Sequence, residues 1–405
     1  MPPKPFQIKV PDVEFERLHQ KLDATTFPDE LGSAGWDMGV PLSEIKRLAA
    51  YWRSGFDWRK QEAKLNTQFK QFTVSVSVEG YEDLELHYLH HISETPGAIP
   101  LLFIHGWPGS FIEATKIIPL LTRGDGNNPA FNVIAPSLPN FGFSSLVKKR
   151  GFGLNQYAEA IHNLMSTLGY EEYVIQGGDW GSFIARIMAQ RYPTYTKAIH
   201  LNFIPMRFPM PWQNPLFFLQ NLLPIPFSPA RKAYLGSVLT YLTKGGGYML
   251  QQSTRPQTLG YALHDSPVAL LAWIYDKLHS WTDGYPWTDD EILTWVSIYL
   301  FSAAGPAASV RIYYETSEDG TLQECMSKPA PPGVKVGVAQ FKEELMRYPL
   351  SWTSLLGNVV RATEYPQGGH FAAWEAPDLL VGDLKEFFGK SGQAYGVIEG
   401  KDGFD

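Results

Sequence analysis

The chain has 405 residues, with 34 Lys and Arg against 41 Asp and Glu, a formal net charge of −7 and 44% hydrophobic residues. These values exclude a disordered or collagen-like chain and predict two or three structural units around a large core. The mild acidic excess, without any long run of like charges, excludes nucleic acid as an expected partner.

The cysteine content and the apolar runs predict a soluble, cytoplasmic protein. Cys325 is the single cysteine, so neither an intrachain disulfide nor a CxxC pair can form. The N-terminal segment mixes prolines with charges and predicts no signal peptide. The longest uninterrupted apolar block, residues 268–275, is far shorter than the roughly 20 residues that a membrane-spanning helix needs. We therefore expect no membrane span.

Residues 1–95 predict an N-terminal arm of helices with a short strand region. Apolar residues recur at helical spacing in 12–22 and 42–52. Apolar and polar residues alternate in 72–78 and 84–89, which is typical of half-buried strands. The aromatic residues of segment 52–58 predict that this arm packs onto a larger body.

From residue 96 the pattern indicates an α/β core with a mostly parallel sheet. Short runs that are apolar on both faces are each followed by a turn and a helical stretch, as in a sheet buried between helices. The runs before residue 205 are 100–104, 131–135, 173–176 and 198–203.

Residues 206–325 lose this alternation and predict a helical lid, with helices at 268–281 and 289–301. The second part of the core, 326–405, then resumes with strands at 334–338 and 358–362 and a closing helix at 377–388. The apolar lid also predicts a possible contact between two copies of the chain, a homodimer.

The segment Tyr173-Val-Ile-Gln-Gly-Gly-Asp179-Trp-Gly-Ser182 predicts a sharp turn from a strand into a helix. Small residues around the turn allow the chain to hold the central side chain, Asp179, on a strained backbone. An aspartate there can displace a leaving group at a saturated carbon and form an alkyl ester, which water then cleaves at the carbonyl of the aspartate. The alternative is an aspartate that caps the following helix.

A second turn, His105-Gly-Trp-Pro-Gly-Ser110, follows the strand at 100–104. Such a loop can aim a backbone N–H at the oxygen that becomes negative when water adds to the ester. We expect the N–H groups of Trp107 and Trp180 to form this oxyanion hole, because one loop lies upstream of the nucleophile and the other residue directly follows it. A plain connecting loop is the alternative.

Water needs a base near Asp179, and histidine serves near neutral pH. Among ten histidines, His370 stands out because two glycines precede it in a loop that follows the strand at 358–362. His87, His90 and His91 favour ordinary surface or core positions, with zinc binding as a minor alternative.

The base needs a carboxylate to orient it. The chain order nucleophile, acid, base places this acid between residues 179 and 370, after a late strand. Glu344 follows the strand at 334–338 and is the preferred candidate, with Glu343 as its rival.

With these segments in place, the chain resembles the epoxide hydrolases of the α/β-hydrolase superfamily, in particular the microsomal type and its soluble fungal members. The segments that carry the resemblance are Gly55-Phe-Asp-Trp-Arg59, His105-Gly-Trp-Pro108, Pro136-Ser-Leu-Pro-Asn-Phe-Gly-Phe143, Gly177-Gly-Asp-Trp-Gly-Ser182, Ser253-Thr-Arg-Pro256 and Gly368-Gly-His370. The resemblance implies an α/β-hydrolase core with a helical lid and an N-terminal arm. It implies hydrolysis of epoxides to vicinal diols by water, with no cofactor and no metal.

The resemblance also implies two lid tyrosines that donate hydrogen bonds to the epoxide oxygen. The matching positions are Tyr248 and Tyr313, and Tyr314 is a neighbour that could be confused with Tyr313. Trp180 after the nucleophile is shared with haloalkane dehalogenases, which makes dehalogenation the alternative function. Lid tyrosines weigh against it, because a halide leaves as an anion and needs no proton. A non-catalytic binding protein is the remaining alternative.

Overall fold

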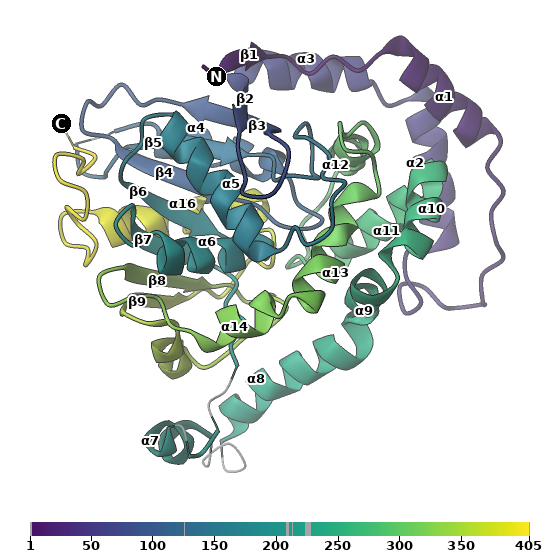
Figure 1. The fold of residues 1–405 in the computed structure, drawn as a ribbon. Coiled ribbons are helices and arrows are strands. Elements are labelled where there is room, and N and C mark those ends of the chain that lie inside the picture. Colours follow the sequence, from purple (N-terminus) through teal and green to yellow (C-terminus); the bar gives the residue numbers. More distant parts are fainter. Residues whose placement is uncertain (1, 125, 208–209, 213, 223–227, 405) are drawn as a thin grey trace.

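The computed structural model describes residues 2–124, 126–207, 210–212, 214–222 and 228–404. Its centre is a nine-stranded sheet in the order β1-β2-β3-β5-β4-β6-β7-β8-β9 (Figure 1). The strands are β1 (Lys4–Phe6), β2 (Gln71–Val76), β3 (Leu84–His91), β4 (Ile99–Ile104), β5 (Phe131–Pro136), β6 (Tyr173–Gly177), β7 (Thr196–Leu201), β8 (Lys335–Gln340) and β9 (Val359–Glu364). The pairs from β1 to β5 are antiparallel and those from β5 to β9 are parallel. The predicted α/β class with a mostly parallel sheet is confirmed.

The central strands form where the sequence is apolar on both faces. Every residue of β4 and β6 is buried, as expected for strands in the middle of a parallel sheet. The helices that follow core strands are α4 (Ile118–Leu121), α5 (Leu154–Thr167), α6 (Trp180–Arg191), α15 (Ala372–Glu375) and α16 (Pro377–Phe388). Because consecutive parallel strands share their direction, the loops after β4, β6, β8 and β9 meet at one edge of the sheet.

The helical lid lies between β7 and β8. Its helices are α7 (Pro215–Phe217), α8 (Pro229–Thr240), α9 (Gly247–Thr254), α10 (Pro256–Asp265), α11 (Pro267–Ser280), α12 (Asp289–Leu300), α13 (Arg311–Glu318) and α14 (Thr321–Ser327). Short 3-10 and π-helical segments are η1 (Phe111–Thr115), η2 (Phe218–Leu222), η4 (Tyr241–Gly245), η5 (Ala308–Val310) and η6 (Leu350–Leu356). Figure 1 shows α7 and α8 extending away from the sheet. Parts of the predicted lid, 208–209, 213 and 223–227, lie outside the described residues.

The helices of the arm join the edge of the sheet to the lid. They are α1 (Asp12–Asp23), α2 (Leu42–Ser54) and α3 (Trp58–Gln68), and they pack on α11 and α12 (Figure 1). Two elements here were not predicted, β1 and α3. The α3 sequence is largely polar and lacks an apolar stripe of helical period. The strands β2 and β3 belong to the same sheet as the core, and the predicted domain boundaries stay a prediction.

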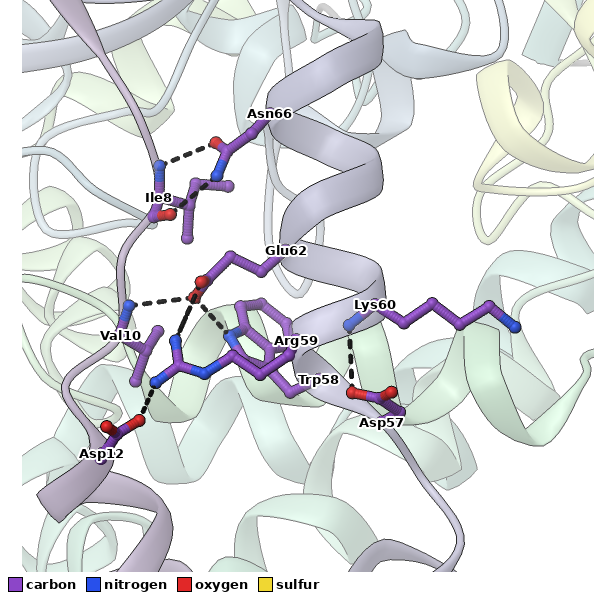
Figure 2. Close-up of polar contacts among 9 residues, drawn as sticks. All are labelled: Ile8, Val10, Asp12, Asp57, Trp58, Arg59, Lys60, Glu62 and Asn66. Carbon is purple, nitrogen blue, oxygen red and sulfur yellow. Dashed lines mark hydrogen bonds and ion pairs between the residues drawn. The ribbon is translucent and has the colours of Figure 1, made fainter.

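A buried carboxylate fixes the arm, as Figure 2 shows. Glu62 on α3 accepts hydrogen bonds from the Val10 N–H at 3.0 Å and from the Trp58 indole N–H at 2.9 Å. Arg59 donates to the same carboxylate at 2.9 Å. Trp58 is the last residue of the predicted aromatic segment and Arg59 directly follows it, and through Glu62 both attach the extended chain before α1 to α3. Within the described residues, no helix is long and apolar enough to cross a bilayer.

Candidate active site

Asp179 lies on a strained turn between β6 and α6. Its φ is +48°, which a non-glycine residue adopts at a cost of about 1–3 kcal/mol. The turn requires glycine at two positions, because any other residue would clash with the backbone there. A Cβ at Gly181 would lie 1.9 Å from the Ile104 carbonyl oxygen, and one at Gly177 would lie 2.5 Å from the Gly181 carbonyl oxygen. The Asp179 side chain makes no capping hydrogen bond to α6, which argues against the helix-cap alternative.

The Asp179 carboxylate is held at one oxygen by the loop after β4. The Trp107 N–H donates to Asp179 Oδ1 at 2.8 Å, as the predicted loop geometry requires of one oxyanion donor. Gly106 lies so close that a Cβ there would be 2.1 Å from the same oxygen. The Trp180 N–H begins α6 directly after Asp179, and the hydrogen bonds of the described residues include none from it to this carboxylate. Its role as a second donor stays a prediction.

His370 lies between two carboxylates. Its Nδ1 is 2.6 Å from Glu344 Oε1, and its Nε2 is 3.3 Å from Asp179 Oδ2. The His370 N–H donates to the Trp281 carbonyl oxygen at 2.9 Å, which anchors the histidine loop to the lid. Glu343 is half-exposed and lies beside Lys342, so of the two predicted acids it is Glu344 that contacts the imidazole.

The electrostatics of this group favour a charged imidazole. Burial is the largest single influence on His370 and lowers its pKa, but the charges of Glu344 and Asp179 and their hydrogen bonds outweigh it. Together they raise the pKa of His370 to about 10. The resting site therefore holds an imidazolium between the two carboxylates at neutral pH.

Two lid tyrosines lie close enough to Asp179 for its charge to act on their hydroxyls. The rings of Tyr248 on α9 and Tyr313 on α13 meet edge to face at 5.9 Å, and both pack on the Trp107 ring at 5.4 and 5.8 Å. Burial, with smaller contributions from neighbouring hydroxyls and the Asp179 charge, raises the pKa of both phenols well above the ordinary value. Both therefore remain hydrogen-bond donors. Tyr314 points elsewhere, since its hydroxyl accepts from Arg150 at 3.2 Å.

Three further residues surround these tyrosines and were not singled out from the sequence. Tyr241 shares a 2.6 Å hydrogen bond with the Tyr248 hydroxyl. The Trp281 ring lies 5.1 Å from both His370 and Tyr248, and the Lys277 ammonium lies 5.1 Å from the centre of the Tyr248 ring. Lys277 and Trp281 are four residues apart at the end of α11, and this helical spacing is a signal that could have identified them. Tyr241 in η4 and Tyr248 in α9 belong to different helical segments, so their spacing carries no such signal.

The cavities differ strongly in size and chemistry. A cavity of about 10 Å³ is lined by Asp179, His370 and a buried acid from η1, Glu113. A groove of about 900 Å³ is lined by residues such as Arg255 and Tyr314, and none of its lining residues belongs to the predicted triad. The small cavity is the candidate chemical site, because the predicted nucleophile Asp179 and the predicted base His370 both line it. His87 is buried elsewhere, with its ring nitrogens bonded to Ser137 and Gln71.

The comparisons with known proteins give the fold and the family. The family model described as alpha/beta hydrolase fold matches residues 99–228, and the model described as Epoxide hydrolase N terminus matches residues 3–114. Epoxide hydrolase 1 of Sus scrofa is 33% identical over an aligned length of 423 residues, and the alignment covers 95% of this chain and 88% of that protein.

Two solved structures are also similar. An epoxide hydrolase of Aspergillus niger has a TM-score of 0.82 at 34% identity, with 96% of each chain covered. The juvenile hormone epoxide hydrolase of the silkworm Bombyx mori has a TM-score of 0.84 at 30% identity, covering 94% of this chain and 93% of that one.

Sheet order, strand-to-helix elbow and family model together define a hydrolase of the α/β type, which confirms the predicted fold. Within that class, the chain belongs to the epoxide hydrolase family. The predicted activity, hydrolysis of epoxides, is confirmed at the level of the family, and the haloalkane dehalogenase alternative is not favoured.

Proposed function

We propose that epoxide hydrolysis in this chain runs through a covalent ester on Asp179. The observation that carries the proposal is the position of the two carboxylate oxygens. Asp179 lies on a strained turn, where its Oδ1 accepts a hydrogen bond from the Trp107 N–H and its Oδ2 faces the His370 imidazole. This division leaves one oxygen to attack and the other to take up charge later.

In the first step, Asp179 Oδ2 attacks a ring carbon and the carbon–oxygen bond of the epoxide breaks. The departing oxygen gains negative charge, which Tyr248 and Tyr313 stabilise by donating hydrogen bonds and then a proton. Their raised pKa keeps the donated hydrogen in place until the ring opens. The hydroxyl contact between Tyr241 and Tyr248 orients one of the donors.

In the second step, water cleaves the ester. Alkylation removes the Asp179 charge, one of the groups that raises the pKa of His370, so the imidazolium releases its proton to restore the phenol that protonated the epoxide oxygen, and the neutral imidazole can act as a base. His370, oriented by Glu344, takes a proton from water while the water oxygen adds to the Asp179 carbonyl carbon. The Trp107 and Trp180 N–H groups stabilise the resulting oxyanion. Collapse of this intermediate breaks the bond to the substrate and releases the diol.

Rapid quenching tests this proposal directly. The enzyme is mixed with an excess of an aryl epoxide and quenched in acid within milliseconds, and its intact mass is measured by mass spectrometry. We expect an adduct with the mass of the substrate, attached to the peptide that contains Asp179. Diol formation without any adduct on that peptide would contradict the covalent route. A panel of racemic aryl and alkyl epoxides, with chiral analysis of the diols, then defines the substrate range.

We further propose that the lid forms a homodimer and that the protein works in the cytoplasm. Large apolar side chains along the extended part of the lid are exposed: Trp212, Leu216, Leu219, Leu239 and Leu242. The buried free thiol of Cys325 fits a reducing compartment. Sedimentation analysis should show a dimer that the double substitution Leu239→Asp, Leu242→Asp converts to a monomer, and a monomeric parent chain would contradict the dimer.

A further inference from the structure

The small cavity lies beside Asp179, and the lid tyrosines do not line it. Its volume of about 10 Å³ is close to what one water molecule requires. Asp179, His370 and Glu113 contribute ionisable groups to its wall, whereas none of Tyr241, Tyr248 and Tyr313 lines it. The space is therefore separate from the position where the tyrosines would hold an epoxide oxygen, and it has the size and polarity for the second substrate, water.

Glu113 is built into this wall rather than placed at the surface. It belongs to η1, which follows the oxyanion loop, and its side chain is buried. The carboxyl group lies against Gly109, where an added Cβ would be 1.8 Å from Glu113 Oε1. The Tyr299 hydroxyl in turn donates to the Gly109 carbonyl oxygen at 2.5 Å, which fixes that part of the loop.

Glu113 has the hydrogen-bonding capacity that a bound water needs. Burial, with a smaller contribution from the Asp179 charge, raises the pKa of Glu113 to about 8, although His370 and the Ser110 backbone oppose this rise. At neutral pH the carboxyl group is therefore protonated and can both donate and accept a hydrogen bond. A neutral acid also avoids adding a third negative charge beside Asp179 and Glu344.

We propose that Glu113 is a positioning residue for the hydrolytic water, an inference that rests on the covalent mechanism proposed above. Glu113 and His370 hold the water from two sides of the cavity. One water proton passes to His370 Nε2 as the water oxygen bonds to the ester carbon of Asp179. The ester carbon–oxygen bond then breaks, and the proton on His370 passes to the departing alkoxide. The second water proton, left on the Asp179 carboxyl group, passes to His370, which restores the carboxylate and the imidazolium of the resting site. Glu113 keeps its own proton throughout.

Single-turnover kinetics with two substitutions test the inference. Quench-flow measurements give separate rates for formation and loss of the ester. Glu113→Leu, which has a similar size and no hydrogen bonds, should slow loss of the ester about 10- to 100-fold and leave its formation within about twofold. Glu113→Gln, which donates and accepts like the protonated acid, should restore loss of the ester to within about threefold of the parent rate.

Tyr299→Phe is the matched control, because it removes a hydrogen bond from the same loop without touching the cavity. We expect it to change neither rate by more than about twofold. If Glu113→Leu does not fold, Glu113→Ala takes its place with the same expected slowing. Loss of the ester at the parent rate in the Leu or Ala variant would overturn the inference. Equal slowing of both steps in Glu113→Gln and Tyr299→Phe would also overturn it, because the effect would then be loop packing.

The two proposals fail in different ways. If the parent enzyme forms diol without any ester, the covalent mechanism itself is wrong. If the parent forms the ester and the Glu113 variants release it normally, only the role of Glu113 is wrong.

Discussion

Two buried histidines in this protein contact a carboxylate, but their surroundings differ. His370 Nδ1 lies 2.6 Å from Glu344, and His200 Nε2 on β7 lies 2.8 Å from Asp383 on α16. Asp383 also accepts hydrogen bonds from Arg361 and, at 2.7 Å, from the Tyr365 hydroxyl, so its charge is fully engaged. The second oxygen of Glu344 has no hydrogen-bond partner among the described residues.

What distinguishes the two pairs is the third group. The second ring nitrogen of His370, Nε2, faces Asp179, which lies on a strained turn at the edge of the sheet where the loops meet. The other nitrogen of His200 is buried between sheet and helix, and within the part of the chain that the structure describes it has no hydrogen-bond partner. A buried histidine–carboxylate pair therefore does not by itself indicate catalysis. It does so when the histidine also reaches a nucleophile beside a cavity.

Removal of the proposed nucleophile should have the largest effect on activity and tests whether the His370 pair belongs to the active site. Asp179→Ala should lower the turnover of any epoxide by about 10⁴-fold or more, because the covalent route is lost. Turnover is followed by diol formation, with the melting temperature as a check of folding. Retention of a tenth of the activity would mean that water attacks the epoxide directly.

Exchanging each histidine for glutamine should separate the two pairs. His370→Gln should form the ester and hydrolyse it about 10³-fold more slowly, because the base is missing, so the adduct accumulates in intact mass spectra. His200→Gln, the matched control, should show parent kinetics. Similar losses in both variants would indicate that the pairs share a structural role.

The lid tyrosines should have a smaller effect. Tyr313→Phe should slow formation of the ester about 10- to 100-fold, because one hydrogen bond to the departing oxygen is lost while that of Tyr248 remains. Tyr314→Phe is the control and should leave both steps unchanged. Full activity of Tyr313→Phe on epoxides would show that this hydroxyl is not a proton donor.

The pair formed by His200 and Asp383 should contribute to the stability of the fold and not to turnover. Asp383→Asn should lower the free energy of unfolding by about 3–5 kcal/mol, because it removes the charge of a fully buried carboxylate that is hydrogen-bonded to His200, Arg361 and Tyr365, with kcat within about twofold. The pKa of Asp383 is held below its usual range, where burial is opposed by the bonds from His200, Arg361 and Tyr365. The stabilisation is therefore present above about pH 4 and disappears on acidification, so denaturant unfolding of parent and variant should converge at low pH. A constant difference across pH would contradict this assignment.

The smallest expected effect is the loss of stability at alkaline pH that follows from deprotonation of His370 beside Glu344. Because the pKa of His370 is raised to about 10, its contribution to stability is complete below about pH 6.5 and is lost as the pH rises to 10. The difference in melting temperature between the parent and His370→Gln should shrink over that interval. A difference that grows with pH would mean that the imidazole is neutral in the resting enzyme.

The sheet and the turns that hold Trp107 and Asp179 were predictable because both depend on local patterns. Apolar runs such as β4 and β6 and the crowded glycines around Asp179 act over a few residues. The choice of Glu344 over Glu343 was not settled by spacing, because adjacent residues differ only in the direction of their side chains. Tyr241 and Glu113 reach the site through the packing of the lid and the loop after β4, which no local pattern reveals. Tyr248 and Tyr313 were identified through resemblance.

The most direct test of the central claim uses water labelled with heavy oxygen. After many turnovers in this water, the Asp179 peptide should carry the label in its carboxylate, because each hydrolysis leaves a water oxygen on the nucleophile, and the Glu344 peptide should not. An unlabelled Asp179 peptide, recovered from enzyme that has produced labelled diol, would contradict the account.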